Sequence, residues 1–260
     1  MVKSPCYIPA SFELLTAMQI RILGCSGGIG PGLRTTSLLV DGRLLIDAGT
    51  GVGDLHAAEL AAIHTVLLTH SHLDHVCGLA FMADNLFGEI DHPLVVHAIP
   101  DTLAVLREHV FNWQLWPDFT VLPDADNPLI VLKPLAAGTP LSIDALTATP
   151  FRVSHTVPAV GYILDAGDGV FAFTGDTCAT ERIWTALNAL DRLDHLMIEV
   201  AFPNQETELA DRSRHFTPNG LRDDLAKLRH RPMLHLTHAK PGSEALIAAQ
   251  RRVALAGWQY

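Results

Sequence analysis

The sequence predicts an α/β fold, and three of its features lead to this interpretation. Short apolar runs of strand length recur from residue 19 to residue 236, and segments with apolar residues at helical spacing separate several of them. Turn residues such as Asp41-Gly42 join neighbouring runs. Histidine and aspartate residues follow the ends of several apolar runs, where strands of one sheet can bring them to a common edge.

The composition is that of a chain that can form a full hydrophobic core. With 260 residues, 48% hydrophobic and 18% charged, we expect a single soluble domain over residues 19–260. The net charge of -10 argues against a nucleic-acid partner or an anionic membrane surface, which require a basic face.

Neither a membrane anchor nor a secretory signal is predicted. No apolar run approaches the roughly 18–20 residues needed to span a bilayer. Residues 1–18 lack the continuous apolar segment of a signal peptide, and we expect them to form a flexible leader, with Met18 as an alternative start. We therefore expect a cytoplasmic protein.

The first predicted strand covers residues 19–23 and leads into the glycine-rich stretch 24–32. This stretch is either a cradle of backbone amides for an anion or a flexible turn beside a site. A dinucleotide-binding fingerprint is excluded because no helix follows the glycines. Asp41-Gly42 is a preferred two-residue turn, and it predicts a hairpin between strands over 37–40 and 43–46.

Asp47 follows this hairpin, and two interpretations of it remain open. An aspartate at a strand end can hold the outer nitrogen of a metal-binding histidine. It can equally cap the backbone amides that lead into a helix predicted over residues 52–62.

The remaining elements are predicted from the same two periodicities. Apolar runs predict strands over 63–68, 94–98, 129–132, 141–143, 146–153, 160–165, 170–174, 195–200 and 233–236. Helical spacing predicts helices over 76–87, 102–110, 180–190, 218–229 and 243–255. Residues 111–127 hold Trp113, Trp116 and Phe119, and form either an insertion that covers a substrate or ordinary packing.

The stretch from His70 to His75 holds three histidines and one aspartate in six residues, directly after a predicted strand. Three imidazole nitrogens and a carboxylate oxygen suit zinc or a similar divalent ion. Four donors this close in sequence rarely all reach one ion, so we expect two ions. The alternative is a polar loop that is rich in histidine. His155, Asp176 and His238 also follow apolar strands, and strand ends at one sheet edge can complete such a site.

This ordered set resembles the signature of the metallo-β-lactamase superfamily: Asp47, then His70-x-His72-x-Asp74-His75, then His155, Asp176 and His238. The resemblance covers residues 19–257. It implies a four-layer αββα sandwich with a metal site at one end of two sheets. It also implies that His70, His72 and His155 bind a first ion. Asp74, His75 and His238 would bind a second ion, and the carboxylate of Asp176 would bridge the two. The ions are expected to be zinc, although manganese and iron accept the same ligands.

Several segments resemble the class II cyclic-nucleotide phosphodiesterases within that superfamily. They are residues 155–162, 174–177, 214–218 and 237–241. This resemblance implies hydrolysis of a small anionic phosphodiester, such as cyclic AMP, by a hydroxide that bridges two metal ions, with Asp74 among the catalytic residues. Departure of the alkoxide then needs an acid. We predict His215 for that role, because it lies outside the seven ligands and its pKa is naturally near neutrality; the alternative is a surface histidine at a helix start.

Other functions of the same fold remain as alternatives. A tRNA 3′-processing endonuclease would carry a basic, glycine-rich arm, which is not found here. A thioester or lactone hydrolase is a further alternative, but such enzymes commonly work without a histidine acid at the place of His215. A non-enzymatic binding protein is disfavoured because it has no need of all seven ligands. Two interpretations of Lys240 also remain open: it contacts a substrate phosphate, or it is a solvated lysine. The remaining histidines have no partners at ligand spacing, and a homodimer is compatible with the sequence.

Overall fold

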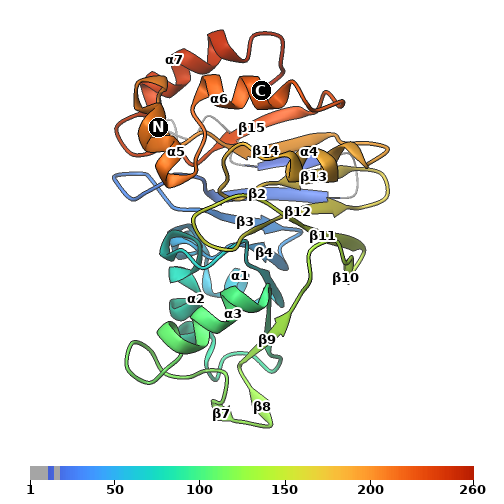
Figure 1. Cartoon of the computed structure of the whole chain (residues 1–260). Coiled ribbons are helices and arrows are strands. Elements are labelled where there is room, and N and C mark those ends of the chain that lie inside the picture. Colours follow the sequence, from blue (N-terminus) through green and yellow to red (C-terminus); the bar gives the residue numbers. More distant parts are fainter. Residues whose placement is uncertain (1–10, 15–17) are drawn as a thin grey trace.

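The computed structural model describes residues 11–14 and 18–260, and in it two β-sheets pack face to face (Figure 1). Helices from the first half of the chain cover the outer face of one sheet, and helices from the second half cover the other. The layers therefore run helix, sheet, sheet, helix. The predicted four-layer αββα sandwich is confirmed.

The first sheet has seven strands in the order β1-β2-β3-β4-β5-β6-β9. Their bounds are β1 Ser11–Leu14, β2 Met18–Gly24, β3 Ser37–Val40, β4 Leu44–Ile46, β5 Thr65–Leu67, β6 Leu94–Ala98 and β9 Ile130–Pro134. The pairings from β1 to β4 are antiparallel, whereas the pairings from β4 through β5 and β6 to β9 are parallel. Asp41 and Gly42 have φ angles of 49° and 69°, as the predicted tight hairpin between β3 and β4 requires.

The second sheet has six strands in the order β10-β11-β12-β13-β14-β15. Their bounds are β10 Leu141–Ile143, β11 Leu146–Arg152, β12 Val160–Asp165, β13 Val170–Phe173, β14 His195–Glu199 and β15 Met233–Thr237. Strands β13, β14 and β15 are parallel, and β11 points the same way because two antiparallel pairings separate it from β13. The carboxyl ends of β11, β13, β14 and β15 therefore meet at one edge of this sheet.

Helices pack on both outer faces. The first sheet is covered by α1 Ala57–Ala61, α2 Leu73–Leu86 and α3 Pro100–Val105, and the second half of the chain contributes α4 Glu181–Asn188, α5 Thr207–Ser213, α6 Pro218–Leu225 and α7 Glu244–Ala254. Within the described ranges, none of these helices combines the length and apolar character that crossing a bilayer demands.

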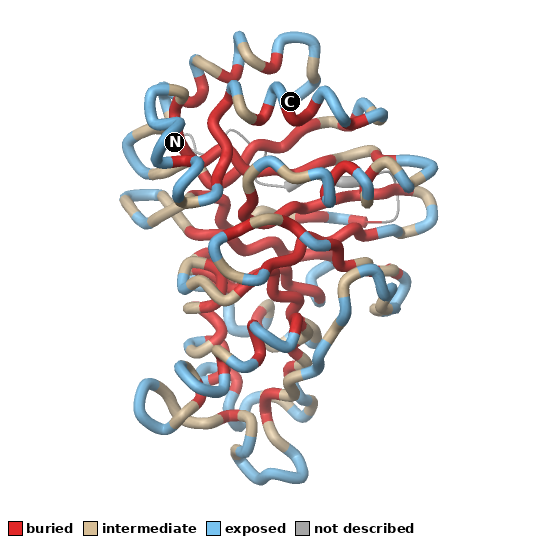
Figure 2. The backbone as a smooth tube through the Cα atoms, in the orientation of Figure 1, coloured by how far each residue is buried: buried red, intermediate tan, exposed pale blue. Residues whose placement is uncertain are grey.

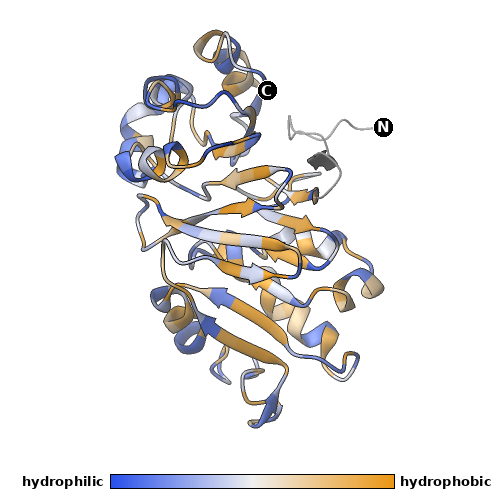
Figure 3. Cartoon of the chain, turned by 90° about the vertical axis from the view of Figure 1, so that its right-hand side faces the viewer, coloured by the Kyte–Doolittle hydropathy of each residue, from blue (hydrophilic) through white to orange (hydrophobic). Residues whose placement is uncertain are grey.

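The layer between the sheets is the apolar centre of the molecule. It includes Ile20 and Leu38 from the first sheet and Tyr162 and Phe171 from the second, all completely buried. Buried backbone runs through both sheets (Figure 2), and the strands carry mainly hydrophobic residues (Figure 3). The Tyr162 hydroxyl donates a hydrogen bond to the Leu68 carbonyl oxygen at 2.7 Å, which links the second sheet to the residue that follows β5.

Two predicted helices differ from those observed, and a third observed helix was not predicted. The helix expected over 52–62 is two pieces, a 3₁₀ turn at Thr50–Asp54 and α1, because His56 and Glu59 form a capping box that starts a new helix. Helix α2 begins at Leu73, three residues earlier than expected, so its first turn already includes two of the predicted ligands. Helix α5 was not predicted; its residues were expected to be loop.

The segment 111–127 is mainly packing, as one of its two interpretations held. Phe111 and Phe119 are buried in the core beneath the first sheet. A short hairpin of β7 Pro123–Asp124 and β8 Asn127–Pro128 follows. Trp113 is 62% exposed and stands apart from that core.

Part of the expected leader over residues 1–18 has regular structure. Ser11–Leu14 form β1, which pairs antiparallel with β2 from Ser11↔Arg21 to Leu14↔Met18, because the edge of β2 offers backbone groups to a further strand. Residues 1–10 and 15–17 lie outside the described part of the chain.

Candidate metal centre

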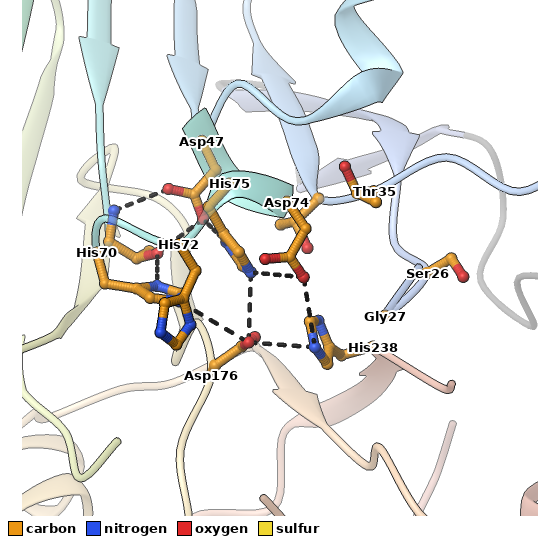
Figure 4. Close-up of polar contacts among 12 residues, drawn as sticks. Ser26, Gly27, Thr35, Asp47, His70, His72, Asp74, His75, Asp176 and His238 are labelled. Atoms are coloured by element: carbon orange, nitrogen blue, oxygen red, sulfur yellow. Dashed lines mark hydrogen bonds and ion pairs between the residues drawn. The ribbon is translucent and has the colours of Figure 1, made fainter. Parts of the chain in front are cut away.

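The predicted ligands converge at one end of the sandwich (Figure 4). His70 follows β5 of the first sheet, whereas His155, Asp176 and His238 follow β11, β13 and β15 of the second. The remaining three lie just before or within the first turn of α2, where His72 is the N-cap residue. The structure therefore brings together all seven side chains that the sequence singled out.

His70, His72 and His155 form one group whose donor atoms all lie within 4.8 Å of one another. His155 Nε2 is 3.1 Å from His72 Nδ1, and the ring centroids of His70 lie 4.7 Å and 5.0 Å from those of His72 and His155. This is the set expected to bind the first ion.

Asp74, His75, Asp176 and His238 form a second group of the same kind. Oδ2 of Asp176 is 3.1 Å from His238 Nε2 and 3.4 Å from His75 Nε2. The same oxygen is 3.9 Å from His70 Nε2 and 4.0 Å from His155 Nε2, in the first group. Asp176 thus stands between the two groups, in the position expected of a bridging carboxylate.

These residues suit metal ions in their chemistry as well as their placement. Nε2 of His70 and Nε2 of His75 are buried and have no hydrogen-bond partner, although both face the cluster. Burial lowers the pKa of His70 and of His238 well below the usual value, so both are neutral, as ligation requires. Buried nitrogen atoms without partners are costly unless a cation occupies the space between them.

Asp47 holds two of these imidazoles in place. Its carboxylate accepts a 2.6 Å hydrogen bond from His75 Nδ1 and further bonds from the Thr69 backbone N–H and hydroxyl, both at 2.8 Å. The Thr69 hydroxyl also lies 2.9 Å from His70 Nδ1. The structure therefore supports the interpretation that Asp47 orients a metal-binding histidine; no side-chain cap is formed at the following 3₁₀ turn.

His155 is held by the backbone of Arg214. Its Nδ1 is 3.2 Å from the Arg214 carbonyl oxygen, and the guanidinium of Arg214 donates to the His155 carbonyl oxygen at 3.0 Å. Arg214 has a left-handed φ of 57° at the end of α5. This turn directs Nε2 of His155 toward the cluster and delivers the next residue, His215, to its edge.

His215 lies beside both groups of ligands. Its ring lies edge-on to that of His155, with the centroids 5.0 Å apart, and stacks on that of His238 at 5.1 Å. It also falls within 4.8 Å of donor atoms of His155 and Asp176. It is only 8% exposed, so the alternative of a surface histidine is excluded.

A fully buried carboxylate, Glu199, supports His215, and sequence reasoning missed it. Oε1 of Glu199 accepts a 2.6 Å hydrogen bond from His215 Nδ1 and a 2.8 Å bond from the Thr177 N–H, while Oε2 accepts one from the Phe216 N–H at 3.2 Å. Burial acts to lower the pKa of His215, but the charge and hydrogen bond of Glu199 outweigh it, so the pKa is raised. The available signal was a lone acid inside the apolar strand 195–200.

The glycine-rich stretch docks on the loop that carries His238. The N–H groups of Cys25 and Ser26 donate to the Arg34 carbonyl oxygen, and Gly27 N–H donates to the Ala239 carbonyl oxygen at 3.0 Å. These three amides are therefore occupied by the protein itself. For this part of the stretch, the interpretation as an amide cradle is not supported.

The histidines to which the sequence assigned no role stay outside both groups, within the described part of the chain. Two of them nevertheless pair with each other. His195 Nδ1 lies 2.8 Å from His235 Nε2, and the rings are stacked at 5.1 Å.

Comparisons with known proteins agree with this fold. A family model described as the β-lactamase superfamily domain matches residues 42–250. A probable 3′,5′-cyclic-nucleotide phosphodiesterase from Yersinia pestis is 27% identical over 257 residues, covering 82% of this chain and 72% of that protein. A ribonuclease Z from Thermobifida fusca is 26% identical over 260 residues, covering 78% of each.

Solved structures agree in fold. The crystal structure of unliganded yeast PDE1 superposes with a TM-score of 0.79 at 18% sequence identity, covering 92% of this chain and 94% of that one.

Proposed function

The chain belongs to the β-lactamase superfamily, and we propose that it is a metal-dependent phosphodiesterase that hydrolyses a small phosphodiester, a 3′,5′-cyclic nucleotide such as cyclic AMP. The observation that carries the proposal is the buried His215–Glu199 pair, which lies against both groups of ligands. The relatives named as cyclic-nucleotide phosphodiesterases support the choice of substrate.

We propose that the two groups of donors bind two divalent ions, and that these ions are zinc. His70, His72 and His155 would hold the first, and Asp74, His75 and His238 the second, with Asp176 shared. When bound, such ions neutralise phosphoryl oxygens and lower the pKa of water toward neutrality. Burial acts to lower the pKa of His75, but the charges of Asp176 and Asp47 raise it, so ion binding would have to displace a proton that the ring favours, because ligation needs the neutral ring.

His215 is the residue that completes phosphodiester cleavage. An alkoxide is a poor leaving group and needs a proton as its bond to phosphorus breaks. His215 Nδ1–H is committed to Glu199, which leaves Nε2 to give that proton. The charge and hydrogen bond of Glu199 raise the pKa of His215 and so favour the protonated ring, which is the form that can donate a proton.

A ribonuclease Z-type activity is the second candidate, since a ribonuclease Z is among the relatives. Between the ligands His155 and Asp176, the described chain has only the hairpin of β12 and β13. A basic tRNA-gripping arm is therefore missing at this place. The net charge of -10 also opposes binding of a large polyanion.

The test is turnover of the purified, metal-loaded protein on a panel of substrates. The panel holds cyclic AMP, cyclic GMP, bis(p-nitrophenyl) phosphate, precursor tRNA and several lactones. We expect the cyclic nucleotides and the diester to be hydrolysed. Turnover of lactones alone would overturn the phosphodiester assignment, and cleavage of precursor tRNA alone would favour the second candidate. A cytoplasmic location and a homodimer remain predictions.

A further inference from the structure

Lys240 places an ammonium group beside the proposed second ion. Its Nζ lies 3.2 Å from His238 Nε2 and donates to the Gly27 carbonyl oxygen at 3.0 Å. His238 Nε2 is in turn 3.1 Å from the shared carboxylate of Asp176. The side chain is partly buried, two residues after the ligand that it contacts.

This ammonium has no carboxylate partner among the described residues. Lys227 shows the contrast, since its Nζ lies 2.6 Å from Asp224 and 2.7 Å from Glu181. No ion pair within residues 11–14 and 18–260 includes Lys240. A partly buried cation without a counter-ion is stabilised when an anion approaches it.

Metal binding would increase the need for that anion. The lone pair of His238 Nε2 that now faces Lys240 is the one a metal ion would take, so Nζ would lose one of its two acceptors. Nζ would keep the Gly27 carbonyl oxygen and still have N–H groups free to donate, because an ammonium carries three. A metal ion nearby also adds positive charge, which an anionic oxygen between the two would offset.

Contact with the glycine-rich stretch holds the Lys240 ammonium beside His238. A Cβ atom on Gly27 would lie 2.5 Å from the His238 carbonyl oxygen and 3.0 Å from Lys240 Cδ. Only glycine lets the two segments approach so closely, and that approach puts the Gly27 carbonyl oxygen within reach of the ammonium. The stretch therefore serves the site through a carbonyl group that holds a cation.

We infer that Lys240 binds a non-bridging phosphoryl oxygen of the substrate and so selects phosphate esters over neutral esters. The inference rests on the proposed function of this site, which it makes more specific. Lysine contributes here as a compact positive charge of the kind that commonly recognises phosphate.

The experiment measures binding of inorganic phosphate to the metal-loaded protein by titration calorimetry. We compare the wild type, Lys240→Met and Lys133→Met. Lys133 is an exposed lysine on β9, outside the site, and its substitution removes the same charge elsewhere. Metal content and melting temperature are recorded for each protein.

We expect Lys240→Met to keep its metal and to bind phosphate roughly 10- to 100-fold more weakly, as for a lost charged hydrogen bond. Lys133→Met should bind like the wild type. Wild-type affinity in metal-loaded Lys240→Met would overturn the inference. Loss of metal from that variant would overturn it too, because Lys240 would then act by organising His238.

Failure of the proposed function has a different signature. If no phosphodiester is turned over by the wild type, the proposed function fails. A selective loss of phosphate affinity in Lys240→Met would still stand in that case.

Discussion

Replacing Glu199 with glutamine tests whether the buried pair acts as an acid or only as packing. Glutamine has the same shape, and its carbonyl oxygen can replace Oε1, which accepts bonds from His215 Nδ1 and the Thr177 N–H. The side-chain NH₂ of the glutamine would then face the Phe216 N–H, so that two hydrogen-bond donors point at each other. The variant should fold, with one buried N–H left unsatisfied at a cost of about 1–3 kcal/mol.

The effect on catalysis follows from the charge. A hydrogen bond to a charged partner contributes about 1.5–3 kcal/mol. Losing the charge of Glu199 therefore lowers the pKa of His215. At neutral pH, less of the ring is then protonated. We expect kcat on cyclic AMP to fall roughly 10- to 100-fold in Glu199→Gln, and roughly 10²–10⁴-fold in His215→Ala, which removes the acid itself.

The choice of leaving group supplies the control. The p-nitrophenolate ion departs without protonation, whereas the alkoxide of cyclic AMP needs a proton, so both variants should keep most of their activity on bis(p-nitrophenyl) phosphate. The double variant should be no slower than His215→Ala, because Glu199 acts only through His215. Equal losses on both substrates, or additive losses in the double variant, would refute the assignment of His215 as acid.

Three further outcomes are expected. Asp74→Ala should lose one of two ions, and elemental analysis that finds both retained would contradict its assignment as a ligand. Asp47→Asn should weaken metal binding roughly 10- to 100-fold, measured by chelator competition, because His75 loses its charged support; unchanged affinity would count against that role.

Burial lowers the pKa of His235 to about 4, so between pH ~6.5 and 4 the unfolded chain binds more protons, and the free energy of unfolding falls as pH falls. The fall is at most about 1.4 kcal/mol per pH unit. His235→Leu should reduce that slope in urea titrations, and an unchanged slope would exclude the effect.

The metal-binding residues could be predicted because each is marked locally in the sequence. His155, Asp176 and His238 follow apolar strands of the second sheet whose carboxyl ends lie at one edge, and His70 follows an apolar strand of the first sheet. The density of ligands from His70 to His75 needed no tertiary information at all.

Contacts between distant segments could not be predicted in this way. Glu199 is a single acid in an apolar strand, and its meaning appears only when the loop after α5 places His215 against it. The Gly27 amide has its partner 212 residues later, at Ala239, so its occupation could not be inferred from the glycine pattern. Strand β1 carries too few residues for its periodicity to distinguish an edge strand from a leader.

The division of the ligands between the sheets bears on what the ions do for the fold. Each proposed ion takes donors from both sheets: His70 and His72 face His155 across the first group, and Asp74 and His75 face His238 across the second. The inner apolar layer already joins the same two sheets without any ion. The apolar contacts of that layer therefore hold the sandwich together alongside any link that the ions would add. The ions would also offset a local cost of burial, since at the edge of that layer buried imidazole nitrogens face one another with no hydrogen-bond partner. The apolar layer and Asp47 hold the ligands in place before any ion binds. Ion binding would therefore not have to supply the free energy that brings the ligands together.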